Sequence, residues 1–191
     1  MRVVDIEHDG QPDVVLELYS GGAHCCSIDQ VFSWQPAAMT YVETQRDFGD
    51  PGARIVDLRR NGRYEFLTAD DSFAYEFTDF AASGLPIEIL TFSGRRFHNV
   101  TRDYPKLIAR DAATWLKAFK SMSSQHYADS VGVIAAWAAD EDLLGHSKLV
   151  GRYLAQQQRA GHLNSSEPGE PSGAKFVAML QRFLRQHGYL S

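Results

Sequence analysis

The sequence lacks several features that would assign it to a protein class at once. No apolar run approaches the ~20 residues that a membrane-spanning helix needs, so we do not expect the chain to span a bilayer. No basic segment is followed by a short apolar one, so no signal peptide is visible and the compartment stays open. The glycine-rich patterns of phosphate-binding loops are absent, as are histidine pairs at metal-ligand spacing.

A surplus of basic residues is also lacking. The chain holds 24 Asp and Glu against 19 Lys and Arg, which gives a net charge of −5. Residues 1–104 hold 17 acids and 9 bases, whereas residues 105–191 hold 7 acids and 10 bases. A nucleic-acid-binding protein needs a basic face, so we expect no nucleic-acid partner. We expect the small positive excess of residues 105–191 to be a solvated helix face.

The most informative segment is residues 4–16, where acidic side chains alternate along the chain before a glycine. Calcium takes oxygen ligands, and alternate positions of a tight loop converge on one cation where a glycine allows a sharp turn. The candidate ligands are the side chains of Asp5, Glu7, Asp9 and Asp13 and the backbone carbonyl of Gln11. An EF-hand would need a glutamate where Leu16 stands, and the apolar flanks predict strands instead of helices.

A weaker copy of this loop begins at Asp57, 52 residues after Asp5. It keeps candidate ligands at Asp57, Asn61 and Glu65. Arg59 stands where an acid is expected, and a guanidinium cannot coordinate a cation although it can replace its charge. Both loops can also be ordinary hairpin turns, because turns favour Asp, Asn and Gly for conformational reasons.

The pattern D-x-[DE]-x-D-G-x-x-D between two strands resembles the bacterial FG-GAP/VCBS-type repeats, whose units are blades of integrin-like β-propellers. The resemblance covers residues 1–104. It implies that Asp5, Glu7, Asp9 and Asp13 bind calcium and that the protein acts outside the cytoplasm. It also favours a non-enzymatic module that binds a protein or a glycan. Glu7 departs from the Asp or Asn that is usual at its position.

Strand patterns fill residues 1–104 in two sets of four. Apolar, β-branched and aromatic residues are bounded by turn residues in each set. The expected strands are 3–6, 14–19, 27–34 and 39–44 in residues 1–52, and 54–58, 64–68, 86–92 and 96–100 in residues 53–104, with a further strand-like segment at 72–77. Two such units cannot close a propeller, which needs ~4–8 blades, so we expect the sheets to pack against following helices.

From Pro105 onward the apolar period changes from two to about 3.6, which predicts helices. Four amphipathic stripes follow, around residues 108–122, 127–138, 149–154 and 176–184, and Gly161 and Gly188 are expected to end the last two helices. The fold class is therefore α+β. An N-terminal antiparallel β-meander of two blade-like repeats, residues 1–52 and 53–104, precedes a four-helix segment, residues 105–191, packed on it.

The only two cysteines, Cys25 and Cys26, are adjacent and follow His24. They can form a vicinal disulfide, or they can be part-buried thiols that pack as small apolar residues. A thiolate at either position beside His24 would instead indicate a thiol-dependent enzyme or redox protein. Two cysteines and one histidine fall one ligand short of a structural zinc site.

Two further features suggest functions more weakly. Asp70 and Asp71 could be a carboxylate pair for acid–base chemistry, but adjacent carboxylates at a strand end usually form a solvated turn, so we expect a structural role. Residues 176–190 are similar to one helix of peptidoglycan-binding repeats, which suggests a cell-wall-associated binding protein. Core packing explains the same apolar stripe without any ligand.

Overall fold

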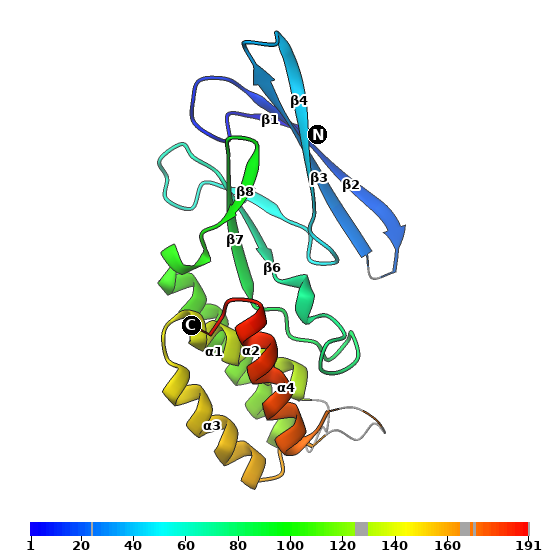
Figure 1. Ribbon diagram of the computed structural model, residues 1–191, viewed down its shortest axis with the longest axis vertical. Coiled ribbons are helices and arrows are strands. Elements are labelled where there is room, and N and C mark those ends of the chain that lie inside the picture. The colour runs from blue at the N-terminus through cyan, green and yellow to red at the C-terminus, as the bar shows by residue number, and fades with distance from the viewer. Residues whose placement is uncertain (24, 125–129, 165–168, 170, 191) are drawn as a thin grey trace. The chain divides into compact units, whose positions relative to one another are not determined.

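The computed structural model describes the chain apart from residues 24, 125–129, 165–168, 170 and 191. It has two four-stranded antiparallel sheets followed by four helices, which confirms the predicted α+β fold (Figure 1). The chain divides into two compact units. A β unit contains residues 1–71 and 88–101, and a helical unit contains residues 72–87 and 102–191. Among the described helices, none combines the length and the apolarity needed to cross a membrane.

Each sheet is a meander whose strands lie in chain order. The first sheet contains β1 (Arg2–Val4), β2 (Asp13–Gly22), β3 (Cys25–Gln35) and β4 (Thr40–Asp47), and the second contains β5 (Arg54–Val56), β6 (Glu65–Ala69), β7 (Ile87–Ser93) and β8 (Arg96–Asn99). All eight strands of the two predicted sets are confirmed. Gly94 and Arg95 join β7 to β8 with positive φ angles of 54° and 60°. Two such residues are typical of a tight type I′ hairpin turn.

One hydrophobic core joins the two sheets. It contains the buried residues Ile6, Val15, Val31, Phe48, Ile55, Phe66, Leu90 and Phe92. The rings of Phe48 and Phe66 are stacked with centroids 5.8 Å apart, and the edge of Phe97 packs on Phe66 at 5.0 Å. Because aromatic side chains bury large areas, these contacts hold the two sheets face to face.

The helical unit is built around one buried helix. Its helices are α1 (Pro105–Ser124), α2 (Val131–Leu143), α3 (Ser147–Arg159) and α4 (Gly173–Gln186), close to the four predicted stripes. Residues 131–140 of α2 are all buried, as its alanine-rich and nearly all-apolar sequence requires. The part of the second predicted stripe at residues 127–129 lies outside the described residues.

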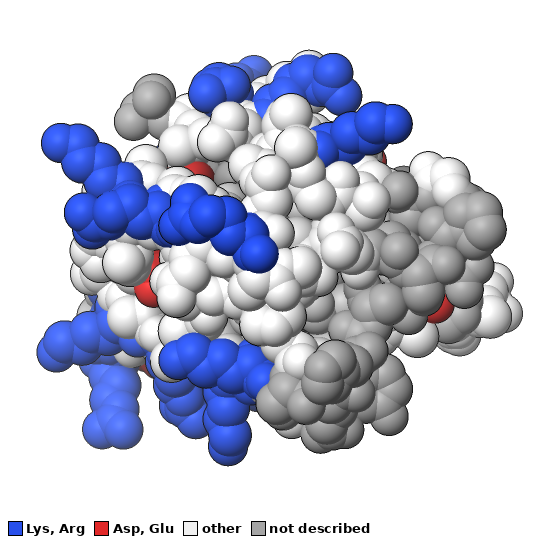
Figure 2. All heavy atoms as spheres, turned by 90° about the horizontal axis from the view of Figure 1, so that it is seen from below, with Lys and Arg blue, Asp and Glu red and all other residues white. Residues whose placement is uncertain are grey.

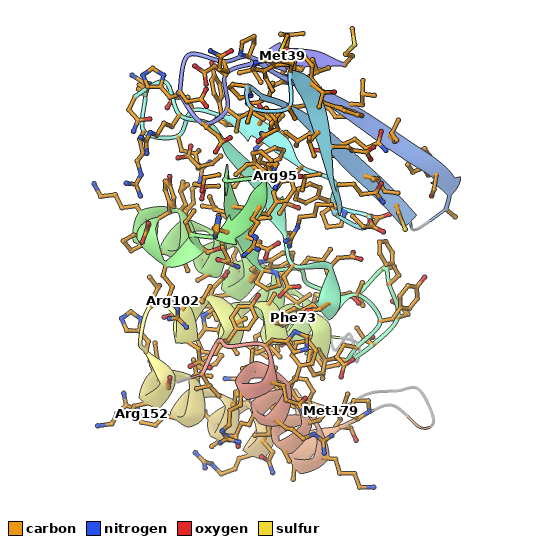
Figure 3. The ribbon with its side chains drawn as sticks, turned by 45° about the horizontal axis from the view of Figure 1, so that its top comes forward. Met39, Phe73, Arg95, Arg102, Arg152 and Met179 are labelled. Carbon is orange, nitrogen blue, oxygen red and sulfur yellow. The ribbon has the colours of Figure 1, made fainter. Side chains whose placement is uncertain are left out.

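The predicted strand at residues 72–77 is wrong. This segment is a short 3₁₀ helix (Asp71–Phe73) followed by turns, and it belongs to the helical unit. Phe73, labelled in Figure 3, is buried in the helical core together with Phe77. Both rings pack edge-on against Phe183 of α4, with centroids 4.9 and 5.3 Å away. Four residues apart, they fill one aromatic cluster without pairing to any strand.

Glycines bring the same segment close to α2. A Cβ at Gly132 would lie 2.5 Å from the backbone oxygen of Ala82, and one at Gly84 would lie 2.8 Å from the Cβ of Ala136. Both distances are too short for a larger residue, so residues 82–84 can contact α2 only because these two positions lack a side chain.

Candidate functional site

The first acidic loop is closed by backbone amides. Both carboxylate oxygens of Asp5 accept hydrogen bonds, Oδ1 from the amide of Asp9 at 3.0 Å and Oδ2 from that of Gly10 at 2.8 Å. Asp9 Oδ1 in turn accepts from the amide of Gln11 at 2.8 Å. The alternating acids therefore fold the loop by binding its own amides.

The second loop repeats this pattern residue for residue. Asp57 Oδ1 accepts from the amide of Asn61 at 3.0 Å, and its Oδ2 accepts from that of Gly62 at 2.8 Å. Asn61 Oδ1 accepts from the amide of Arg63 at 3.1 Å. Because every donor and acceptor lies 52 residues after its counterpart, the internal repeat inferred from the sequence is also present in the backbone.

A second hydrogen bond ties each loop to the strand that follows it. Asp13 Oδ2 accepts from the amide of Ile6 at 3.1 Å, and Glu65 Oε2 accepts from that of Leu58 at 3.0 Å. Each of these acids is nearly buried at the start of a strand. The loops also share two left-handed positions, one of them a glycine, at His8 and Gly10 and at Arg60 and Gly62. Asp13 and Glu65 therefore act as structural anchors.

The two loops differ most at one equivalent position, where the first loop has Glu7 and the second has Arg59. Glu7 Oε1 accepts a hydrogen bond from the amide of Gly94 at 2.8 Å. Burial, followed by the negative charges of Asp13, Asp9 and Asp5, raises the pKa of Glu7 despite that hydrogen bond. Burial likewise raises the pKa of Asp13. The acids of the first loop thus lie close enough together to repel one another.

The opposite shift occurs in the second loop. Hydrogen bonds from backbone amides, that of Gly62 first, lower the pKa of Asp57. Over the described residues, no three His, Cys, Asp or Glu side chains are arranged to hold a metal ion together. The hydrogen bonds alone account for the shape of both loops, so calcium at either loop stays a prediction.

The cysteine segment lies at the β2–β3 hairpin. Cys26 is disulfide-bonded, and its amide donates a hydrogen bond to Ser20 Oγ at 2.8 Å. His24 and the side chain of Cys25 lie outside what the structure describes. A disulfide-bonded sulfur has no thiolate, so in this form Cys26 cannot act as a nucleophile.

Asp71 has a structural contact, as expected. Its Oδ1 accepts a hydrogen bond from the amide of Asp50 at 3.4 Å, and burial raises the pKa of its carboxyl. The carboxylate also lies against Gly49, where an added Cβ would be 2.1 Å from Asp71 Oδ2. Gly49 has a φ of 63°, so this turn needs glycine for two reasons.

The outer face of the first sheet is apolar although it lies outside the core. Successive side chains of β2 and β3 point to opposite faces of the sheet. Val15 and Val31 therefore point into the core, and the residues next to them in the sequence point to the outer face. This outer face consists of Val3, Val14, Leu16, Leu18, Ile28, Phe32, Trp34 and Tyr41, with polar Gln30, Glu43, Gln45 and Asp47 beside them. Trp34 and Tyr41 pack edge to face across β3 and β4 at 5.3 Å.

The internal repeat allows the outer face of the first sheet to be compared with the equivalent face of the second sheet. On it, Val3 of β1 pairs with Val14 of β2. The equivalent pair 52 residues later is Ile55 of β5 and Phe66 of β6, and both are buried in the core against the first sheet. The outer face is therefore the repeat equivalent of a face that packs on another sheet. Val3 is 62% exposed, whereas Phe66 is 0% exposed.

The sequence did not indicate two buried acids. Asp29 of β3 is 2% exposed and lies opposite Glu17 of β2. Its burial, helped by the charge of Glu17, raises its pKa to about 6. In the helical unit, burial and then the charge of Asp111 raise the pKa of Asp140 to about 10. A raised pKa of this size favours the protonated, uncharged form of Asp140 at neutral pH.

Two open hollows lie at the surface. One in the β unit, about 640 Å³, is lined by Thr44, Ser93, Gly94, Arg95, Arg96 and His98. The other, in the helical unit, is about 570 Å³ and is lined by Gly145, His146, Ser147, Lys148, Leu149 and Arg152. Basic side chains dominate the polar lining of both, so the hollows suit anions better than cations.

Comparisons with known proteins give two curated relatives and no family. No family model matches the chain, and no solved structure does. The chain is 24% identical to a probable thylakoid lumen protein of Synechocystis sp. over 207 residues, which cover all of this chain and 60% of that protein. It is also 24% identical to an uncharacterized protein of Sinorhizobium fredii over 139 residues, 72% of this chain and 22% of that protein. The chain thus spans less than two thirds of either relative.

Proposed function

We propose that this chain is a non-enzymatic interaction module that pairs with a second copy of itself through the outer face of its first sheet. The repeat equivalence of that face supports its being covered by another sheet, and the distribution of its apolar and acidic side chains supports a second copy of the chain as that partner. The same face of the second sheet is buried by sheet-on-sheet packing within the β unit. Its counterpart on the first sheet is also apolar, with Val3, Leu18 and Tyr41 exposed and its other apolar residues half-buried.

The chemistry of the outer face favours a twofold partner. Its apolar side chains lie over β1, β2 and β3, whereas Glu43 and Asp47 lie on the edge strand β4. Two copies related by a twofold axis through the apolar part would bury it on both sides. The acids of β4 would then stay at the rim, where their charges remain solvated. Face-to-face pairing of two sheets is an ordinary mode of β packing.

Two observations support a location outside the cytoplasm. Cys26 is disulfide-bonded, and disulfides persist mainly in oxidising compartments. The relative that aligns with the whole chain is named a probable thylakoid lumen protein, and the thylakoid lumen is a compartment outside the cytoplasm. The resemblance to FG-GAP/VCBS-type repeats implies the same location.

Sedimentation velocity over a range of protein concentrations tests the pairing. We expect a monomer–dimer equilibrium that Leu18→Glu weakens at least tenfold, because the twofold axis would place each new charge in an apolar interface. Leu149→Glu is the matched control. Leu149 lies on α3 and is 42% exposed, against 43% for Leu18.

Three outcomes decide the matter. Loss of the dimer in Leu18→Glu alone supports the proposal, provided that both variants keep the wild-type melting profile. If the wild-type protein is a monomer at every concentration, the self-pairing proposal is wrong. The partner of the outer face would then be a sheet of a different protein segment. Equal weakening by both variants would place the contact elsewhere.

A further inference from the structure

Three helices of the helical unit, α1, α3 and α4, are rich in exposed basic residues. All ten Lys and Arg residues of residues 105–191 lie on three helices, and all ten are exposed. They are Lys106, Arg110, Lys117 and Lys120 on α1, Lys148, Arg152 and Arg159 on α3, and Lys175, Arg182 and Arg185 on α4. Figure 2 shows Lys and Arg side chains projecting around the edge of one face of the molecule.

On these three helices acidic residues do not compensate the charge, although the helical unit as a whole has 11 Lys and Arg against 10 Asp and Glu. The three helices carry a single acid, Asp111, whose Oδ2 accepts hydrogen bonds from the amide of Ile87 and from Trp115 Nε1, both at 3.0 Å. Asp140 and Asp142 of α2 are buried, and Asp140 is uncharged at neutral pH. Glu141 is paired with His146 Nδ1 at 2.7 Å.

The bases are aligned along each helix. Lys148, Arg152 and Arg159 of α3 are four and seven residues apart, which places them in one stripe of an α-helix. The opposite side of α3 is anchored in the core by Val150 and Leu154. Figure 3 shows the side chain of Arg152 pointing away from α3. The three basic side chains of α3 therefore lie on its solvent-facing side, and the packing of its opposite side fixes their positions.

We propose that this cationic surface binds the anionic head groups of a phospholipid bilayer, with the α3 stripe as its main contact. Basic side chains near an anionic bilayer gain binding energy that adds up along the surface. Leu149, beside Lys148 and 42% exposed, offers an apolar side chain to the interfacial region. The three helices lie on the bilayer under this proposal without entering it.

A nucleic acid is the less suitable polyanion. Proteins that bind single strands stack bases on exposed aromatic side chains. Every aromatic residue on α1, α3 and α4 is buried or half-buried, namely Trp115, Phe119, Tyr153, Phe176 and Phe183.

Co-sedimentation of the full chain with vesicles tests the proposal. We expect binding to vesicles of equal parts phosphatidylglycerol and phosphatidylcholine at least tenfold tighter than to phosphatidylcholine alone. Raising the salt from about 20 to about 300 mM should weaken binding strongly, because the Debye length shrinks. The triple variant Lys148→Glu, Arg152→Glu, Arg159→Glu should lower the partition constant at least tenfold.

A charge-matched control separates the stripe from net charge. Arg54, Arg60 and Arg63 of the β unit are also exposed, and reversing all three changes the net charge by the same amount. This variant should bind vesicles within about twofold of wild type, and so should Leu18→Glu, whose only expected defect is in self-pairing. Equal losses in both triple variants would overturn a role for α3. Binding to a single-stranded oligonucleotide without binding to anionic vesicles would overturn the lipid proposal.

Discussion

The first and second repeats share one loop and differ in what covers their sheets. In both, an aspartate binds two amides of its own loop at the same distances, and a nearly buried acid anchors the following strand. The second sheet buries its Ile55–Phe66 pair, whereas in the equivalent pair of the first sheet Val3 is exposed and Val14 is half-buried. Local geometry is thus repeated more faithfully than burial. Similar sequence positions can have the same backbone and very different energetic importance.

The largest expected contrast concerns the equivalent core and outer positions. Phe66→Ala should lower the free energy of unfolding by about 3–5 kcal/mol, because it removes a fully buried ring between the two sheets. Val14→Ala, 52 residues earlier, should cost about 1 kcal/mol or less in dilute protein, where the outer face is solvated. Urea unfolding of both variants measures the difference. Equal costs would mean that the outer face is already covered in the monomer.

Asp29 gives the first repeat a pH dependence of its own. Its folded pKa of about 6 lies above the usual value near 3.8, so the folded state holds its proton more tightly. The contribution of Asp29 to stability should therefore be largest below pH ~4 and should fall as the pH rises through about 6, by roughly 2–3 kcal/mol. Asp29→Asn should remove this loss and raise the melting temperature at pH 7. A variant that melts at or below the wild-type temperature at pH 7 would contradict the shift.

The two loops should respond to acid in opposite directions. Glu7 has a raised pKa, so its charge destabilises the fold at neutral pH and this effect disappears as the pH falls through its folded pKa. Asp57 has a lowered pKa, so its contribution is present above about pH 4 and is lost below that. Glu7→Gln should therefore raise the melting temperature at pH 7, while Asp57→Asn should lower it. Thermal melts from pH 3 to 8 check both signs.

Calcium should produce the smallest difference between the repeats. The first loop combines four nearby carboxylates, and a bound cation would relieve their repulsion, whereas Arg59 makes the second loop unsuitable. Millimolar calcium should raise the melting temperature by a few degrees, equivalent to about 1 kcal/mol. Asp9→Ala should abolish this rise, and Asn61→Ala at the equivalent position should not. An identical melt in calcium and in chelator would show that hydrogen bonds alone close the first loop.

Strands, helices and the repeated loop could be predicted because their signals are local. The Asp-rich pattern and the glycine at Gly10 specify a turn from neighbouring residues, and the same holds around Asp57. Helices α1, α3 and α4 follow from apolar periodicity, including the two that end before Gly161 and Gly188, whereas α2 is apolar on all sides and was predicted wrongly as amphipathic. These features needed no knowledge of distant contacts.

The features that the sequence analysis missed all depend on distant residues. Phe73 and Phe77 look like strand residues until the ring of Phe183, more than a hundred residues later, is placed against them. The burial of Asp29 and Asp140 depends on which side of each element meets the core. The outer face did leave one signal, the run Val14, Val15 and Leu16, which is apolar on both sides of a strand and is typical of a strand covered on both faces.

The path of the chain through its two units limits how the protein can be dissected. The polypeptide passes between the units three times, near residues 71, 87 and 101, and residues 72–87 carry Phe73 and Phe77 into the helical core. A fragment cut at residue 105 would leave the helices without those two rings and would expose the aromatic side chains of α4. A usable truncation should instead keep residues 72–87 joined to residue 102 by a short engineered linker that replaces β7 and β8.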